Sequence, residues 1–277
     1  MNPEALLIRE HGREMVKVGG FILPAENFNL ARFLRDDLGT TWLHAGGLPS
    51  TLHLVRKLDI RPGMRVLDLG CGVGSATRHL AKRSACHVTG VDADAEMLAR
   101  ARKATPAALA DRIEYARMDV SRTGFADASF DRVVIQSVAC FNKKPPLFRE
   151  AARLLRPGGL LGMNEVAWLK PPTPEIEQVM CATICETFHG AELSRGWIAH
   201  LEAAGLVEAQ AEEHPFTAAT PYQILREEGL VNTLRIMWRV LSDPEINMRL
   251  SAMSEMFRKC PEYFSYGIYT ARKPLVA

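Results

Sequence analysis

The sequence lacks a long hydrophobic run, an excess of charge of one sign and a paired-cysteine motif. No apolar stretch reaches the roughly 18 residues that a membrane-spanning helix needs. Residues 1–14 carry scattered charges instead of a signal-peptide core. The 34 basic and 32 acidic residues nearly balance, so nucleic acid is not favoured as a partner. We therefore expect a cytoplasmic protein without a membrane span.

The six cysteines form no C-x-x-C pair and no regular framework, so we expect reduced thiols. Cys181 and Cys185 lie four positions apart in a predicted helix and share one of its faces. Together with Cys140 or His189 they could bind a soft metal, whereas such cysteines are more often buried as small hydrophobic side chains. We favour burial and predict no metal site.

What the chain does contain is a glycine-rich turn between an apolar run and a helical pattern. Residues 66–69 are typical of a buried parallel strand, and residues 75–82 have helical spacing. The turn between them, residues 70–74, has the pattern G-x-G-x-G, and glycine lets the backbone approach a ligand without a Cβ in the way. Asp92, twenty positions after Gly72, ends the next predicted strand and could accept both ribose hydroxyls. The pattern predicts a nucleoside-binding crevice.

A dinucleotide is the alternative ligand for such a turn. The dinucleotide-binding pattern G-x-G-x-x-G would require a third glycine at position 75, where this chain has Ser75. An NAD(P)-dependent oxidoreductase is therefore kept only as an alternative.

The turn resembles motif I of the class I S-adenosylmethionine-dependent methyltransferases, in which an acid such as Asp68 precedes the first glycine by two residues. Val91-Asp92 resembles the ribose-binding acid of that family. Met118-Asp119 resembles the acid that receives the adenine amino group. Two longer segments, residues 125–134 and 154–161, resemble the family's run into its fourth strand and the turn before its fifth.

The resemblance is strong over roughly residues 60–165 and is closest to the small-molecule group that includes quinone-biosynthesis enzymes. It implies S-adenosylmethionine as cofactor, S-adenosylhomocysteine as product and a small-molecule methyl acceptor. It also implies that residues at the carboxyl ends of the strands bind the cofactor. These residues are Asp68, Gly70, Cys71, Gly72, Gly74, Asp92, Ala93, Met97, Met118, Asp119, Val120, Gln136 and Ser137.

The acids also have structural alternatives. Asp92 could cap the helix predicted at 95–103, although Asp94 is better placed for that. Asp119 could cap a turn. We assign Asp92 to the ribose and Asp119 to the adenine, and we expect Asp68 to order the glycine turn and to face the amino end of the methionine moiety.

Methyl transfer needs positioning and exclusion of water, with a general base where the acceptor must lose a proton. Glu165 ends the fifth predicted strand on the ligand side of the sheet, and an ion pair with Lys or Arg is its alternative. His44 lies at 42–49, a stretch that related enzymes fold over the cofactor, and a surface position is its alternative. We predict catalytic roles for Glu165 and His44. Further candidate bases are His53, His189, His200 and His214.

Alternating strands and helices predict a doubly wound, Rossmann-like α/β fold with seven mostly parallel strands. The resemblance implies that the last strand is antiparallel. We expect an N-terminal helical segment over the cofactor site at 1–60, a cofactor-binding core at 61–165, and the rest of the sheet at 166–277, with helical caps at about 166–193 and 214–261. Strands are predicted near 64–69, 87–92, 113–118, 130–136, 159–165, 206–212 and 263–272, and longer helices near 25–38, 49–58, 95–103, 175–188, 195–204, 221–241 and 244–259.

Methionine and aromatic residues in the predicted caps favour an apolar acceptor, although such stripes more often form core or a homodimer contact. We therefore predict a methyltransferase that acts on a carbon, oxygen or nitrogen of a small, largely apolar molecule, and we expect a homodimer. A non-catalytic protein that binds S-adenosylmethionine is a second alternative.

Overall fold

The computed structural model describes residues 6–10, 13–18, 21–24, 32–174, 176–177, 180, 190–216 and 220–275. The chain divides into two compact units, which are described separately. The core unit comprises residues 44–167, 191–214 and 266–277, and the second unit comprises residues 1–43, 168–190 and 215–265.

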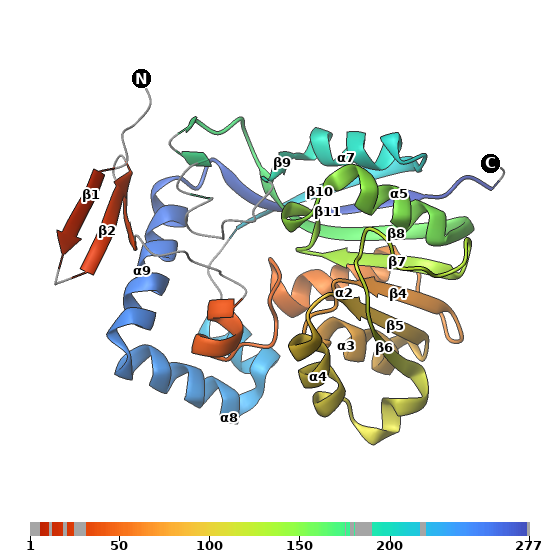
Figure 1. The fold of residues 1–277 in the computed structure, drawn as a ribbon, viewed down its shortest axis with the longest axis horizontal. Helices are drawn as coiled ribbons and strands as arrows, with labels where there is room; N and C mark the ends of the chain where they lie inside the picture. The colour runs from red at the N-terminus through yellow and green to blue at the C-terminus, as the bar shows by residue number, and fades with distance from the viewer. Residues whose placement is uncertain are drawn as a thin grey trace. The chain divides into compact units, whose positions relative to one another are not determined.

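A large sheet, most of which belongs to the core unit, has the strand order β10-β11-β8-β7-β4-β5-β6, and the short β9 pairs with β8 (Figure 1). The pairs β4/β5, β4/β7, β5/β6 and β7/β8 are parallel. The strands are β4 (Arg65–Leu69), β5 (His87–Asp92), β6 (Ile113–Arg117), β7 (Phe130–Gln136), β8 (Leu155–Trp168), β9 (Glu192–Leu193), β10 (Val207–Pro215) and β11 (Phe264–Arg272).

The last strand, β11, runs antiparallel to β8. Near the start of β8, Gly158 N–H donates to the carbonyl of Lys273 at 3.0 Å, and Lys273 N–H donates to the carbonyl of Gly159 at 2.9 Å. Just past the end of β8, Leu169 N–H donates to the carbonyl of Tyr263, which precedes β11. The predicted doubly wound sheet with seven strands and an antiparallel last strand is confirmed, and β9 adds a two-residue strand to it.

Side chains that alternate along the strands of the core unit enter two separate hydrophobic cores. Val133 and Ile135 of β7 pack in one core with residues of α5 and α7, whereas Val134 packs in the other with residues of α2 and α3. Trp197 anchors the first core, since its fully buried indole donates from Nε1 to the carbonyl of Val166 at 3.1 Å. The helices are α2 (Gly47–Lys57), α3 (Ser75–Ser84), α4 (Ala95–Ala104), α5 (Lys144–Leu154) and α7 (Ser194–Ala203).

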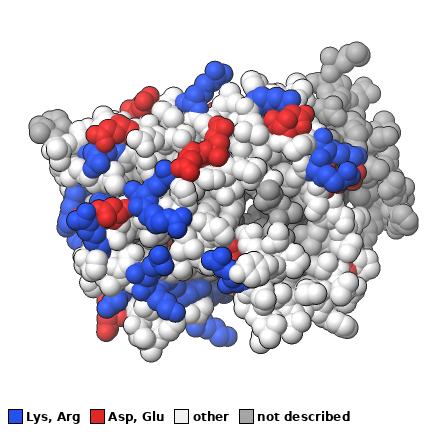
Figure 2. Space-filling model, turned by 180° about the vertical axis from the view of Figure 1, so that it is seen from behind, with Lys and Arg blue, Asp and Glu red and all other residues white. Residues whose placement is uncertain are grey.

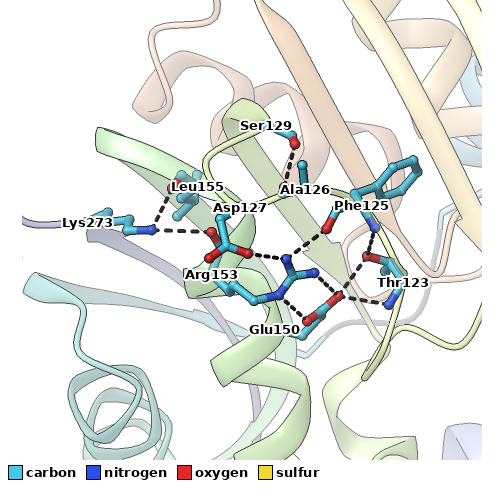
Figure 3. A network of polar contacts seen from close by, with 9 residues as sticks. All are labelled: Thr123, Phe125, Ala126, Asp127, Ser129, Glu150, Arg153, Leu155 and Lys273. Atoms are coloured by element: carbon cyan, nitrogen blue, oxygen red, sulfur yellow. Dashed lines mark hydrogen bonds and ion pairs between the residues drawn. The ribbon is translucent and has the colours of Figure 1, made fainter.

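The loop that precedes β7 is fixed to α5 by a polar network (Figure 3). Arg153 donates to the carboxylate of Glu150 at 2.8 Å and to that of Asp127 at 2.5 Å. Glu150 Oε1 also accepts from the backbone N–H of Thr123 at 2.8 Å and from its hydroxyl at 2.7 Å. Lys273 donates from Nζ to the carbonyl of Arg153. This network orders the segment that leads into β7.

The N-terminal part of the second unit differs from the expected helical segment at 1–60. Residues 6–24 contain three antiparallel strands in the order β1-β2-β3, and the expected helix at 25–38 is described only as a π-helix, η1 (Phe33–Leu38). Two-residue segments that contain glycine, at positions 11–12 and 19–20, separate apolar runs in the sequence, which is a hairpin signal that helical periodicity does not capture. The strands are β1 (Leu6–Glu10), β2 (Arg13–Val18) and β3 (Phe21–Pro24).

Two helices follow in the second unit, α8 (Pro221–Ser242) and α9 (Pro244–Lys259), close to their predicted bounds. Gly229 interrupts α8 with φ 72° and ψ 166°, a conformation that only glycine adopts readily. Large exposed apolar side chains follow this break, among them Val231, Trp238 and Leu241. No helix in the described part of the chain is long and apolar enough to cross a membrane. The helix predicted at 175–188, with Cys181 and Cys185, lies largely outside the described residues, as does His189 after it.

Charge on the drawn face of the molecule is mixed. Figure 2 shows Lys and Arg side chains with Asp and Glu among them, and broad uncharged areas between. Among the residues coloured in that view, neither sign forms an unbroken field over this face.

Candidate cofactor and acceptor site

The glycine turn begins where β4 ends and takes backbone conformations that favour glycine. Gly70 has φ +76° and Gly72 has φ +54°. A Cβ on Gly70 would clash with the side chain of Val138, so Gly70 is required for packing. A Cβ on Gly72 would meet no described atom within 4 Å. Gly72 therefore has open space on the side where a Cβ would point, and this is the space that a bound nucleoside would need.

The carboxylate of Asp92 lies directly beside this turn. Its Oδ2 accepts the N–H of Gly72 at 2.8 Å, and its Oδ1 accepts the N–H of Asp94 at 2.9 Å. The N–H groups of Gly70 and Cys71 both donate to the carbonyl of Val91, which holds the turn against the end of β5. Each carboxylate oxygen has a second lone pair, so Asp92 can accept further hydrogen bonds from a ligand.

Asp94, not Asp92, caps the following helix. The side chain of Asp94 accepts from the N–H groups of Glu96 and Met97 at the start of α4, at 2.8 and 3.4 Å. Asp94 therefore satisfies the orphan amides of the helix, as its position in the sequence predicts.

Asp68 is buried at the carboxyl end of β4, with 2% of its surface exposed. Thr77 of α3 donates its hydroxyl proton to Asp68 Oδ2 at 2.6 Å. Burial raises the pKa of Asp68 to about 6, against the lowering effect of the Thr77 hydrogen bond, and the charge of Asp92 raises it further. Asp68 thus joins the strand before the glycine turn to the helix after it. The contact with the methionine moiety stays a prediction.

The remaining predicted cofactor residues lie around the ends of β5 and β6. Met118 N–H donates to the carbonyl of Asp92 at 3.1 Å, so the two strand ends are adjacent. Asp119 Oδ1 accepts from Ser121 N–H at 2.8 Å, which places Asp119 in the turn proposed as its alternative role, and its adenine contact stays a prediction. Val120 is buried in the core. Three other predicted residues lie close by: Ala93 before the N-cap of α4, Met97 in the first turn of α4, and Cys71, a buried thiol whose pKa is raised by burial.

Gln136 ends β7 beside Asn164 of β8, and Ser137 follows it. Gln136 is buried, and its Oε1 accepts from the hydroxyl of Thr51 at 2.8 Å. Ser137 has φ +52°, donates its N–H to the carbonyl of Asn164 at 2.8 Å and accepts the N–H of Ala45 on its Oγ at 3.3 Å. Within the described part of the chain, Gln136 Nε2 and Asn164 Oδ1 are buried polar atoms without a hydrogen-bond partner. Buried atoms of this kind usually have a partner, so they mark a place for a polar ligand group or water.

His44 joins this network from the segment before α2. Its Nε2 lies 2.9 Å from the hydroxyl of Thr51 and 3.1 Å from the carbonyl of Gly47. The carbonyl can only accept, and the hydroxyl gives its proton to Gln136, so the His44 proton lies on Nε2 and the lone pair on Nδ1. Desolvation lowers the pKa of His44 to about 4, although the hydrogen bond to Gly47 raises it. The imidazole is therefore neutral at neutral pH.

Glu165 is fully buried near the carboxyl end of β8. Its Oε1 accepts from the N–H groups of Val138 and Ala139 at 2.7 and 2.6 Å, and its Oε2 accepts from the Cys140 thiol at 2.8 Å. Burial raises the pKa of Glu165, and these hydrogen bonds oppose that shift. Among the described residues, Glu165 thus bonds to the loop after β7, and not to the Lys or Arg that the sequence offered as an alternative. The role as a base stays a prediction.

The other candidate bases do not join this network among the described residues. His53 and His214 lie against Glu212, and His200 lies 3.3 Å from Glu192. His189 lies outside the described residues. Sequence reasoning missed Thr51 and Asn164, because neither belongs to a motif and both reach the site only through the fold.

A mostly parallel sheet with a glycine turn after β4 and an acid at the end of β5 defines a Rossmann-like protein. A family model described as a methyltransferase domain matches residues 66–159. The 27-O-demethylrifamycin SV methyltransferase of Amycolatopsis mediterranei is 31% identical over 236 residues, which are 81% of this chain and 82% of that enzyme. The chain belongs to the S-adenosylmethionine-dependent methyltransferases, as its motifs predict.

Other relatives match a smaller part of their own length. Phosphoethanolamine N-methyltransferase 1 of Arabidopsis thaliana is 31% identical over 140 residues, which are 50% of this chain but only 28% of that enzyme. A solved structure of Haemonchus contortus phosphoethanolamine N-methyltransferase 2, in complex with phosphomonomethylethanolamine and S-adenosylhomocysteine, has a TM-score of 0.71 and 20% identity. That match covers 91% of this chain and 62% of the other, and it supports the fold alone.

Proposed function

We propose that this chain transfers a methyl group from S-adenosylmethionine to a small, largely apolar molecule. The observation that carries the proposal is the contact between the Gly72 N–H and the Asp92 carboxylate at 2.8 Å, at the carboxyl ends of two adjacent parallel strands. Family membership supports the reaction. The names of two relatives specify phosphoethanolamine and 27-O-demethylrifamycin SV, which supports a small molecule as the acceptor.

The residues at the glycine turn fit an adenosyl group. Gly72 has open space on its Cβ side, and Asp92 would hold the ribose hydroxyls through its carboxylate. Asp119 would bind the adenine amino group from the next strand end. When bound, S-adenosylmethionine supplies an electrophilic methyl group on its sulfonium sulfur. The protein must then orient the acceptor and exclude water.

The network at the ends of β7 and β8 would orient the acceptor. Gln136 Nε2 would donate to an oxygen or nitrogen of the acceptor, and neutral His44 would accept a proton on Nδ1 where the acceptor must lose one. Glu165 would act by fixing the backbone of the loop at Val138 and Ala139 beside Gln136. In this proposal His44 can touch the acceptor and Glu165 is a positioning residue.

Calorimetry and mass spectrometry test the proposed reaction. We expect S-adenosylhomocysteine to bind tightly and NADH to give no response, and we expect a metabolite pool incubated with enzyme and S-adenosylmethionine to contain a product heavier by one CH₂ unit. NADH binding in place of S-adenosylhomocysteine would favour the oxidoreductase. Tight S-adenosylhomocysteine binding without any methylated product from a broad pool would favour the non-catalytic protein.

Glu165→Gln separates a base from a positioning residue. Loss of a base lowers kcat and removes the limb of the pH profile that the base produces, whereas a positioning role predicts a change in the acceptor KM and in stability with a smaller loss in kcat. Gln retains one oxygen acceptor for the N–H groups of Val138 and Ala139.

The cytoplasmic location and the homodimer expected from the sequence also stay predictions, which cell fractionation and sedimentation would test.

A further inference from the structure

Three side chains that the methyl-transfer site does not use converge between α2 and β10 of the core unit. His53 comes from α2, and Glu212 and His214 come from β10, where their spacing of two residues puts them on the same face of the strand. His53 Nε2 lies 3.2 Å from Glu212 Oε2, and His214 Nε2 lies 3.7 Å from Glu212 Oε1. One donor atom from each side chain lies within 4.8 Å of the other two.

The orientation of the His214 ring is fixed by its neighbours. Tyr266 of β11 stacks on it with 5.2 Å between ring centroids and 20° between planes, and the His53 ring meets it edge-on at 5.4 Å. His214 Nε2 is shielded from solvent and has no hydrogen-bond partner among the described residues, since the 3.7 Å separation from Glu212 is too long for a hydrogen bond. The His214 nitrogen and the Glu212 carboxylate therefore face each other without a hydrogen bond. An atom bound between them would satisfy both groups.

We propose that His53, Glu212 and His214 form a binding site for a divalent transition metal of the zinc class. Zinc binds imidazole nitrogen and carboxylate oxygen at about 2.0–2.2 Å in a tetrahedral arrangement, so its ligand atoms lie roughly 3.3–3.5 Å apart. The three donor atoms need only small side-chain rotations to reach that spacing. Two imidazole ligands disfavour Mg²⁺ and Ca²⁺, which prefer all-oxygen sites. Solvent would supply the fourth ligand, because all three side chains are partly exposed.

Lys57 is the natural competitor of this metal. Its ammonium lies 2.6 Å from Glu212 Oε2, one helical turn after His53 on α2. A metal that takes this carboxylate must weaken the ion pair, so Lys57 lowers the affinity of the site. Removal of the ammonium without loss of the side-chain stem should therefore strengthen metal binding.

The metal would join α2 to the sheet. The same helix carries Ser50 and Thr51, which hold the segment at His44 and Ala45 through hydrogen bonds. A metal held by α2 and β10 would thus stabilise the helix on which the acceptor end of the methyl-transfer site depends. The sequence shows no ligand motif for this site, because His53 and Glu212 are 159 positions apart.

Cobalt titration of chelator-treated, tag-free protein tests the site. We expect one equivalent of Co²⁺ to produce the absorption of tetrahedral nitrogen and oxygen ligands, and we expect calorimetry to give Zn²⁺ binding of matching stoichiometry. His53→Ala and His214→Gln should each weaken Zn²⁺ binding by at least about tenfold. Lys57→Met should tighten it several-fold. His200→Gln is the matched control, since His200 pairs with Glu192 and no second histidine joins them among the described residues, so its loss should leave Zn²⁺ binding unchanged.

Thermal unfolding adds a readout that does not depend on activity. Zn²⁺ should raise the Tm of the unaltered protein by a few degrees and leave the Tm of His214→Gln unchanged. Circular dichroism of each variant shows whether it is folded before metal is added. The proposal fails if folded His53→Ala and His214→Gln bind metal as the unaltered protein does, or if the cobalt spectrum shows thiolate ligands, which would assign the metal to cysteines. Absence of any one-equivalent binding would also overturn it.

Discussion

The proposed cofactor end and the proposed acceptor end of the site are built from different kinds of groups. At the cofactor end, a bare glycine backbone meets one carboxylate, and the contact joins Gly72 to Asp92 across adjacent strand ends. At the acceptor end, the side chains of Thr51, Gln136 and His44 form a chain of hydrogen bonds. Few residues can replace glycine in the turn at the cofactor end, because only glycine leaves the required space. A side-chain network can change residue by residue, which is how one fold serves many acceptors.

The largest expected effect is at the cofactor end, with Gly72→Val. Valine would be strained at φ +54°, and its side chain would fill the open space that a nucleoside needs. We expect calorimetry to show S-adenosylhomocysteine affinity reduced by more than about a hundredfold while circular dichroism remains native.

Gly63→Val is the matched control for backbone strain. Gly63 has φ +77° and open space around its Cβ position among the described atoms, but it lies in the turn at the opposite end of β4. The control should lose stability and keep its cofactor affinity. Equal loss of affinity in both variants would mean that strain, and not ligand contact, explains the effect at Gly72.

The second-largest expected effect is a pH dependence of stability that comes from Asp68, the buried carboxyl group at the cofactor end. The pKa of Asp68 is about 6 in the folded protein, above the 3.8 that is usual for an aspartate, so the folded state holds the proton more tightly. The stability contributed by protonated Asp68 is present below about pH 4 and is lost as the pH rises through 6. The change corresponds to about 3 kcal/mol at most.

Urea unfolding of the cofactor-free protein between pH 4 and 7 measures this change. Asp68→Asn keeps an oxygen for Thr77 and cannot titrate, so its free energy of unfolding should fall less over this interval than that of the unaltered protein. Parallel pH profiles for the two proteins would show that Asp68 titrates alike in the folded and unfolded states.

The third prediction compares two neighbouring acids, Asp92, which we propose binds the cofactor, and Asp94, which caps α4. Asp92→Ala should weaken S-adenosylhomocysteine binding by about 1.5–3 kcal/mol through lost charged hydrogen bonds. Asp94→Ala should cost about 1 kcal/mol of stability, since it removes the cap of α4, with little change in cofactor affinity. A loss of only a few tenths of a kcal/mol in S-adenosylhomocysteine binding by Asp92→Ala would mean that Asp92 has a structural role.

The two ends also differ in how far the sequence predicts them. Gly72 and Asp92 belong to motifs on consecutive strands, so strand order and spacing place them together before any coordinates exist. At the acceptor end, the resemblance implied Gln136 and Ser137 only as cofactor residues, and His44 was predicted as a catalytic residue. Thr51 and Asn164 were not predicted, because 85 positions separate Thr51 from Gln136 and only the packing of α2 on the sheet joins them. Long-range side-chain contacts carry no local periodicity.

The second unit shows the opposite error, in which a local signal was present and overlooked. The run Phe21-Ile22-Leu23 follows two glycines, a hairpin pattern, yet a helical segment was expected there. The predictions for α8 and α9 succeeded because prolines mark both starts. The cap over the substrate remains a prediction, because apolar side chains on helices such as α8 serve substrate, core and dimer contacts alike.

The smallest expected effects on binding and catalysis come from two buried threonines, one at each end of the site, and they test the comparison most directly. Thr51 bonds His44 and Gln136 at the acceptor end, whereas Thr77 bonds Asp68 at the cofactor end. Replacement of either by the nearly isosteric valine should cost about 1–3 kcal/mol of stability, because a buried polar partner is left unsatisfied.

Their kinetic effects should separate the two ends. Thr51→Val should lower kcat or raise the acceptor KM by roughly five- to tenfold, because it frees the His44 ring and the Gln136 amide, with cofactor affinity nearly unchanged. Thr77→Val should instead weaken cofactor binding by a similar factor and leave the acceptor KM alone, because Asp68 loses the bond that joins the glycine turn to α3. Identical kinetic profiles for the two variants would contradict this separation, and would mean that the two ends act as one coupled network or that stability loss alone explains both effects.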